Sequence, residues 1–169
     1  MGEVTSTSRP VYAFNGPVEI GLRALAILRE AFPEPCSLQK LVVFDYLVVH
    51  SDDLPGGPEG LHPKTPHRGE ELTVRRGIMQ AGLMLYESRG LIARVYAEAG
   101  VQFTATERSA AFLDSLAAAY SVNLRERARW LVEQMGSQSD EDLQRLVSEN
   151  VGKWGAEFEL ESVLWAELP

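Results

Sequence analysis

The hydrophobic positions in the first third of the chain predict two helices. Between residues 15 and 32, apolar positions recur at helical spacing opposite polar positions, and the polar side is expected to face water. The apolar positions are Leu22, Leu25, Ile27 and Leu28, and the polar ones are Glu19, Arg23 and Glu30. Asn15 is the expected cap, Pro17 suits the first turn, and Pro33 with Pro35 ends the helix.

Residues 38–50 predict a second helix that has almost no polar side. Ser37 is its expected cap, and a helix that is apolar all round belongs at the centre of the core. The many β-branched residues also permit a buried strand, but about 13 residues is long for one.

Residues 51–69 are dense in proline and glycine, which excludes regular structure and predicts a long loop. Loops of this length are uncommon inside compact domains and are often functional, so this one is a candidate contact surface. Glu70 and Glu71 then open a third helix that ends at Gly90. Its apolar side is Leu72, Met79, Leu83 and Tyr86, and its polar side is Thr73, Arg76, Gln80 and Glu87.

Two short β-prone runs, residues 91–96 and 101–105, predict a β-hairpin. Thr104 and Glu107 have the spacing of a capping box, which predicts a fourth helix that continues through Tyr120.

The last two predicted helices follow without a long loop. The fifth has the clearest amphipathic pattern of the chain and ends at Gly136. Ser139 and Asp142 start the sixth. The fifth carries Leu124, Ala128, Leu131 and Met135 on its apolar side, and the sixth carries Leu143, Val147, Val151 and Trp154.

Composition narrows the class of protein. The 169 residues include 16 Lys and Arg against 24 Asp and Glu, so the net charge of -8 disfavours a free-standing nucleic-acid binder. No apolar stretch approaches the roughly 20 residues that span a bilayer. The Ser- and Thr-rich start reads as a flexible lead rather than a signal peptide. The single cysteine, Cys36, forms no internal disulfide and is expected to be a packing residue, which agrees with a reducing compartment, the cytoplasm.

Together these elements predict a mainly α fold with a β-hairpin, in which a winged-helix-like core is followed by C-terminal helices. Residues 1–13 are the lead, 14–136 the core, and 137–169 a C-terminal helix with an acidic-aromatic tail. The third helix takes the place of a recognition helix, and the hairpin takes the place of the wing. The long 51–69 connection and the weakly basic third helix argue against DNA reading, whereas winged helices also serve as protein-docking modules.

Several short motifs resemble the middle component of bacterial ABC-three-component systems over about residues 14–136. They are the run from Gly16, Leu61–Pro63, Arg68–Leu72, the pair Arg75 and Arg76, and Gly90–Ile92. That family is similar to the small accessory subunit of Lamassu-type anti-phage complexes, where an SMC-like ATPase works with a separate effector, often a nuclease. The resemblance implies a non-enzymatic adaptor that docks near the ATPase heads. The alternatives are a stand-alone winged-helix transcription regulator and a small hydrolase.

Candidate catalytic and metal-binding residues are few. His62, His67 and Glu70 are metal-ligand types, but their spacing fits no zinc pattern and a solvated loop explains them. Acid–base chemistry by Asp45, Asp52, Asp53 and His50 lacks a nucleophile, and solvation of a helix end explains these residues better. Because no phosphate-binding loop occurs, a partner is expected to bind the ATP. No enzyme activity, cofactor or metal is therefore predicted.

Partner binding has stronger candidates. Trp154, Phe158, Leu160 and Trp165 are large anchors in an acidic tail. The alternative is that the tail adds an edge strand to its own hairpin. Lys64, Arg68, Arg75 and Arg76 form a local positive excess that suits DNA held by a larger complex or acidic groups of a partner. The cluster of Arg125, Arg127 and Arg129 around Glu126 is expected to be a solvated, self-paired face.

Overall fold

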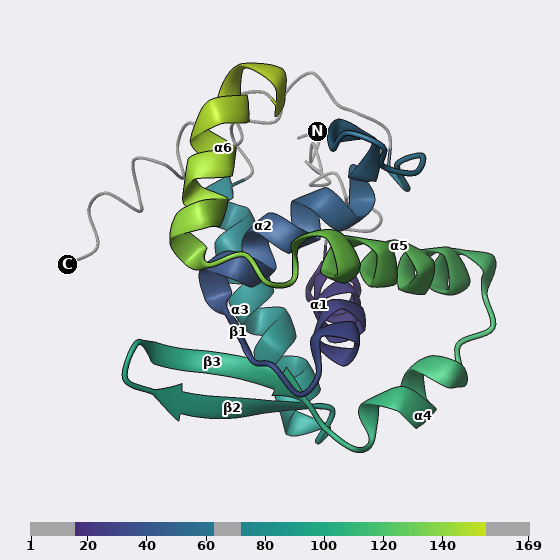
Figure 1. Ribbon diagram of the computed structural model, residues 1–169. Helices are drawn as coiled ribbons and strands as arrows, with labels where there is room; N and C mark the ends of the chain where they lie inside the picture. Colours follow the sequence, from purple (N-terminus) through teal and green to yellow (C-terminus); the bar gives the residue numbers. More distant parts are fainter. Residues whose placement is uncertain (1–15, 63–71, 155–169) are drawn as a thin grey trace, which may run out of the picture.

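The computed structural model describes residues 16–62 and 72–154, and it describes side chains for residues 16–62 and 76–150 (Figure 1). The described part is mainly helical with one small antiparallel sheet, which confirms the predicted fold class. The elements are α1 (Pro17–Ala31), β1 (Cys36–Ser37), α2 (Leu38–Val49), the short 3-10 helix η1 (Ser51–Asp53), α3 (Leu72–Ser88), β2 (Ile92–Ala97), β3 (Gly100–Ala105), α4 (Ser109–Asp114), α5 (Ala119–Met135) and α6 (Asp140–Trp154).

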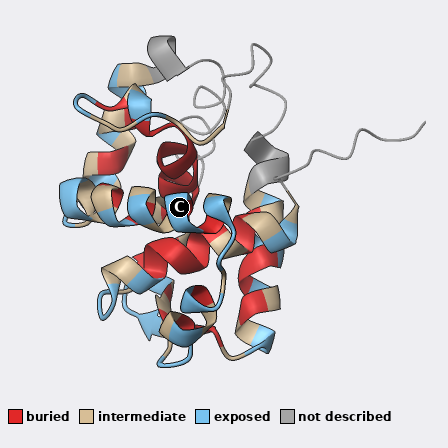
Figure 2. Cartoon of the chain, turned by 90° about the vertical axis from the view of Figure 1, so that its right-hand side faces the viewer, coloured by how far each residue is buried: buried red, intermediate tan, exposed pale blue. Residues whose placement is uncertain are grey.

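Helix α2 lies at the centre of the core, as predicted. Every residue from Leu41 to Val49 is buried, and Figure 2 shows buried residues concentrated on the inner helices. The Ser37 hydroxyl accepts a hydrogen bond from the Lys40 amide at 3.1 Å, which confirms the predicted cap. The helix predicted for residues 38–50 is therefore confirmed, and the alternative of a buried strand is wrong. The cap and the length of the segment both oppose a strand.

Helix α1 differs from the prediction in two respects. It begins at Pro17 with Gly16 as its cap residue, and Asn15 lies outside the described residues. Arg23 was expected to face water, but it is 0% exposed. The reason is that α1 is covered on more than one side, and a buried carboxylate pairs with Arg23.

Helices α1 and α3 cross at a pair of glycines. A Cβ added at Gly82 would lie 2.9 Å from the Gly21 amide nitrogen, and one added at Gly21 would lie 2.5 Å from the ring of Tyr86. The two backbones therefore approach each other more closely than any larger residue permits. The predicted apolar side of α3 faces this contact, since Met79, Leu83 and Tyr86 are buried.

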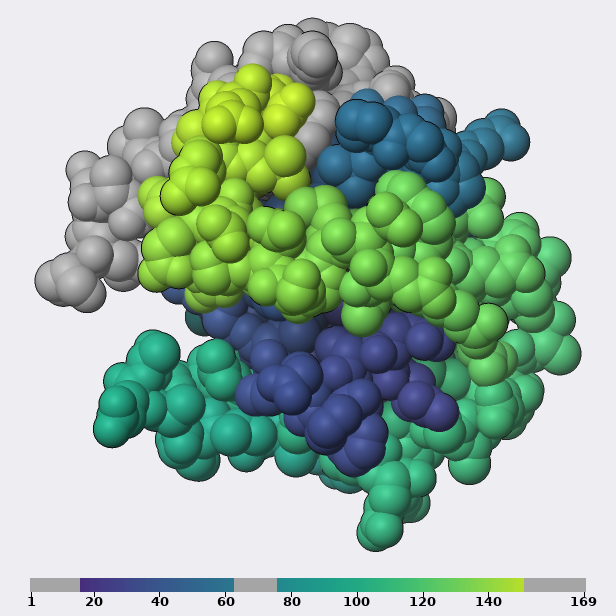
Figure 3. Space-filling model, in the orientation of Figure 1, coloured from purple at the N-terminus to yellow at the C-terminus, as the bar shows by residue number. Residues whose placement is uncertain are grey.

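The sheet has a strand that the sequence did not predict. Strand β3 lies between β1 and β2, and Cys36 of β1 pairs with Phe103. The hairpin of β2 and β3 itself is confirmed, with Glu98 and Ala99 at its turn. Figure 3 shows the hairpin projecting from the helical body.

The segment after α2 is more regular than predicted. Residues 51–53 form η1, although the proline and glycine density had excluded regular structure. The amides of Leu61 and His62 donate to the Val49 carbonyl at 2.9 and 3.2 Å, so the chain returns to the end of α2.

Helix α4 is shorter than predicted, and the Thr104–Glu107 capping box is wrong. Thr104 belongs to β3, where it pairs with Ala93. The helix begins after Arg108, which makes no side-chain capping hydrogen bond, and the Thr106 amide donates to the Ser109 hydroxyl at 2.9 Å. The helix ends at Asp114, and Tyr120 belongs to α5. Strand pairing over the whole hairpin outweighs the local cap signal at Thr104.

Helix α6 begins as predicted and packs against α2. The Asp142 amide donates to the Ser139 hydroxyl at 3.1 Å, and the Ser139 amide donates to the Asp142 carboxylate at 3.2 Å. This is the reciprocal bonding of a capping box. Lys40 donates to the carbonyl of Gly136 at 2.6 Å, so α2 also binds the end of α5. Leu143 and Val147 join the core.

Candidate partner-binding surfaces

Most of the predicted partner-binding residues fall where the structure does not describe side chains. Phe158, Leu160, Trp165, Lys64 and Arg68 lie outside the described residues. The backbones of Trp154 and Arg75 belong to α6 and α3, but their side chains are not described. Arg76 is therefore the one predicted contact residue whose side chain is placed.

Arg76 lines a groove of about 520 Å³ between α3 and the hairpin, which we call the α3–hairpin groove. Phe103 and Leu83 contribute to its apolar part. Met84 is 60% exposed and Val101 is 40% exposed, so large apolar side chains face solvent at this groove. Exposed apolar side chains that lie together are typical of protein-binding surfaces.

The polar side of α3 is only weakly basic at this groove. Arg94 of β2 donates to the Glu87 carboxylate at 2.8 Å, and its guanidinium lies 5.7 Å from the centre of the Phe103 ring. The pKa of Arg94 is raised, because Glu87 accepts its hydrogen bond and stabilises its charge. One arginine of the groove is thus already paired, and Arg76 has no ion pair among the described residues.

A buried ion pair joins α1 and α2. Arg23 donates to the two carboxylate oxygens of Asp45 at 2.6 and 3.0 Å, and both side chains are 0% exposed. Burial lowers the pKa of Arg23, but the Asp45 carboxylate and the Tyr120 hydroxyl raise it, and the net direction is upward. Asp45 is therefore a packing counter-charge rather than a free acid or base. A single charged residue in the run from Leu41 to Val49 was the sequence signal for this pair.

Tyr120 connects the ion pair to the segment after α2. Its hydroxyl lies 2.9 Å from His62 Nε2, and the two rings stack with centroids 5.9 Å apart. Burial raises the pKa of the Tyr120 hydroxyl. Arg127 donates to the Glu59 carbonyl at 2.9 Å. Two residues of α5 thus hold the chain that leads to residues 63–71.

The other predicted chemical groups also serve in packing. The Tyr46 hydroxyl donates to the Asp53 carboxylate, and the ring of His50 lies 4.7 Å from that of Tyr46. Cys36 is buried, and burial raises the pKa of its thiol to about 11. This agrees with the packing role predicted for the cysteine.

The arginine cluster of α5 is paired, but largely with residues outside the cluster. Arg125 binds Asp114 at the end of α4, and Arg129 lies 3.8 Å from Glu30. Arg127 lies 4.0 Å from Glu126, which is the one pair within the cluster.

Neither a metal-binding cluster nor a membrane-spanning helix occurs among the described residues. No group of three or more His, Cys, Asp or Glu side chains is placed to hold a metal ion within residues 16–62 and 76–150. Among the helices of the described ranges, none has the length and apolar character needed to cross a membrane.

The described residues thus form a helical protein in which most of the polar side chains considered above connect one helix or segment to another. The α3–hairpin groove is apolar and weakly basic, a character typical of surfaces that bind other proteins. The model of the family ABC-three component (ABC-3C) system Middle Component 2 matches residues 13–157. The chain belongs to this family, which makes it an accessory subunit that partners the other components of such a system. Neither the curated proteins nor the solved structures contain a match to the chain. The family match confirms the resemblance to the middle component of ABC-three-component systems and extends it beyond residue 136 into α6.

Proposed function

We propose that the chain is a non-enzymatic adaptor of an SMC-like ABC ATPase defence complex of the Lamassu type. It docks at the ATPase heads in the cytoplasm and links them to an effector, often a nuclease, and it meets DNA only within the complex. The family match over residues 13–157 carries this proposal, because a middle component works with other components.

The order of elements supports a winged-helix-like core. The chain runs α1, β1, α2, α3, β2, β3, with α3 in the place of the recognition helix and β2–β3 in the place of the wing. Between α2 and α3 lie more than 20 residues, from His50 to Glu71. A helix-turn-helix needs a turn of about three or four residues, so this connection favours protein docking over DNA reading.

The α3–hairpin groove is the proposed docking surface among the described residues. We expect Met84→Asp with Val101→Asp to reduce co-purification with the ATPase component of its system, because two carboxylates would enter an apolar contact. Both side chains are exposed, so the melting temperature should stay within about 2 °C of the native value. Val122→Asp is the matched control, since Val122 is 43% exposed on α5 and does not line the groove.

The tail is a second proposed contact. Truncation of Trp165 or Phe158 to Ala should remove about 2 kcal/mol or more of association and leave the fold intact. The alternative, an edge strand on the chain's own hairpin, has the opposite result: complex yield would be unchanged and the melting point would fall.

The proposed adaptor has no turnover of its own. The isolated chain should show no nuclease, ATPase or hydrolase activity. Metal-dependent cleavage that His62→Ala abolishes would contradict this, although His62 is engaged with Tyr120.

The element order also suits the alternative, a stand-alone winged-helix regulator. The net charge of -8 and the pairing of Arg94 with Glu87 favour the adaptor. Duplex binding by the free chain should therefore be weak, whereas a regulator should bind duplex on its own with a steep salt dependence. A sequence-specific nanomolar complex near physiological salt would favour the regulator instead.

A further inference from the structure

A second cleft, of about 950 Å³, lies where α1 begins, α3 ends and α4 passes beside them. We call it the α4 cleft. It shares no lining residue with the α3–hairpin groove, and the sequence patterns did not single out its two arginines, Arg89 and Arg108. Its volume is in the range that binds several side chains of a peptide or a small ligand.

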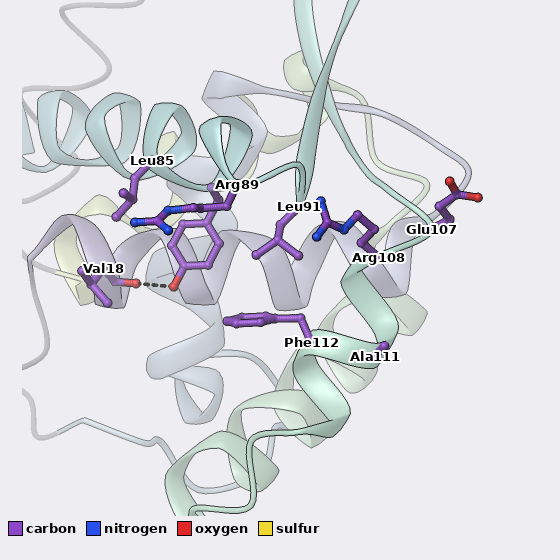
Figure 4. A pocket seen from close by; sticks show the side chains of 9 residues that line it. Val18, Leu85, Arg89, Leu91, Glu107, Arg108, Ala111 and Phe112 are labelled. Carbon is purple, nitrogen blue, oxygen red and sulfur yellow. Dashed lines mark hydrogen bonds between the residues drawn. The ribbon is translucent and has the colours of Figure 1, made fainter.

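The floor of the α4 cleft is apolar and built from well-packed rings. Tyr86 is 7% exposed and Leu91 is 8% exposed. The Tyr86 ring meets Phe112 edge-on, with centroids 6.3 Å apart. The Tyr86 hydroxyl donates to the Val18 carbonyl at 2.9 Å, as Figure 4 shows, so its polar atom is already satisfied. The floor therefore offers carbon surface to an occupant.

The rim of the cleft carries two arginines that form no ion pair with any described residue. Figure 4 shows the guanidinium groups of Arg89 and Arg108 on either side of Leu91. Both residues are exposed, and no described carboxylate lies within 4.0 Å of either one, although Glu107 is on the same rim. A Cβ at Gly90 would lie 3.0 Å from Arg108 Nη1, so the guanidinium lies over this glycine, whose φ of +72° disfavours any other residue.

We propose that the α4 cleft binds an acidic peptide segment of another component of the same ABC-three component system. A bulky apolar side chain of this segment lies on Leu91 and Phe112, and the carboxylates of the segment pair with Arg89 and Arg108. Planar guanidinium groups bind carboxylates in a bidentate manner, and aromatic floors hold large apolar anchors. This inference rests on the proposed function, since it names the chemistry of one contact in the assembly.

A protein segment suits the cleft better than nucleic acid. The floor between the two arginines is apolar, so it suits a bulky apolar side chain better than a continuous phosphate backbone. The net charge of -8 opposes nucleic acid further, whereas a short acidic segment meets only the local positive charge of the rim.

The test is photo-crosslinking in the assembled complex. A diazirine amino acid replaces Ala111, which is exposed and lines the cleft, in the full chain co-expressed with the other components of its system. After illumination, mass spectrometry should place the adduct on a segment of another component that combines Asp or Glu with a large apolar residue.

A charge reversal and a matched control make the test specific. Arg89→Glu with Arg108→Glu should lower the adduct yield by about tenfold or more, because two charge-assisted contacts become repulsive. Arg29→Glu with Arg145→Glu changes the net charge equally at exposed positions outside the cleft, and it should keep the adduct. Both variants should keep a helical circular-dichroism spectrum.

The outcomes separate this inference from the proposed function. Normal assembly with an adduct on DNA, on this chain itself or on a segment without carboxylates would overturn the inference alone. Persistence of the adduct after reversal of Arg89 and Arg108 would also overturn it. Failure of the unmodified chain to assemble with any component would contradict the proposed function as well.

Discussion

Removal of one partner of the buried ion pair should destabilise the protein far more than removal of both. In Asp45→Ala, Arg23 keeps the Tyr120 hydroxyl as a polar neighbour but loses its counter-charge. Because Arg23 is 0% exposed, water does not replace the carboxylate unless the core opens. Breaking a fully buried pair in this way typically destabilises a protein by about 3–5 kcal/mol.

A loss of about 3–5 kcal/mol is a large share of the total free energy of unfolding of a single domain. Single domains are stable by about 5–15 kcal/mol, and about 1 kcal/mol corresponds to 2–4 °C in a domain of this size. The melting temperature of Asp45→Ala should therefore fall by roughly 10 °C. The double variant, Arg23→Met with Asp45→Leu, removes both charges at similar volume. It should stay within about 1–2 kcal/mol of the native chain, since the desolvation penalty disappears together with the attraction.

Urea unfolding of the full chain at pH 7, followed by circular dichroism, measures these differences. Glu87→Ala is the control, because it breaks the Arg94–Glu87 pair, whose side chains are 36% and 34% exposed, and should change stability by at most about 1 kcal/mol. The reasoning is refuted if Asp45→Ala unfolds within about 1 kcal/mol of the native chain, or if the double variant is as unstable as the single one.

Three further predictions concern local packing. Gly82→Ala should destabilise the protein by about 1–3 kcal/mol, because its Cβ would lie 2.8 Å from a carbonyl oxygen of α1. Gly77→Ala, in the same helix but with no atom within 4 Å, should instead stabilise by up to about 1 kcal/mol, and equal effects in urea unfolding would contradict the close helix crossing. Burial raises the pKa of the Cys36 thiol to about 11, so roughly one thiol in a thousand is ionised at pH 8. A colorimetric disulfide reagent should therefore modify Cys36 only on unfolding, and rapid native modification would refute its burial. Ser139→Ala should cost about 1 kcal/mol through loss of the α6 cap, whereas Ser137→Ala, at an exposed site, should be close to neutral, and two equal denaturation curves would count against the cap.

Caps and apolar periodicity predicted most of the helices well, because both signals are local. The Ser37 cap of α2 and the Ser139 cap of α6 are formed as expected. The apolar side of α5 is buried at Leu124, Ala128 and Leu131. Each of these features depends on residues within one or two helical turns, which the sequence lists in order.

The candidate surfaces were much less predictable. The α3–hairpin groove joins residues of α2, α3 and both hairpin strands, and the sequence singled out Arg76 but not its neighbours Met84 and Val101. The α4 cleft draws one arginine from the residue after α3 and the other from the residue before α4. Residues from separate elements share a surface only after the helices have packed, so periodicity within one element does not reveal it.

The sequence by itself determined the helical character, the central place of α2, the hairpin and the acidic balance of the chain, since these follow from local spacing and composition. The tertiary structure decided three things that local rules misjudged. Strand β1 exists because Cys36 meets Phe103, 67 positions later, in the sheet. Arg23 is buried because α1 is covered by neighbouring helices and Asp45 supplies its counter-charge. Thr104 stays in β3 because the paired strand satisfies more backbone groups than one capping hydrogen bond does.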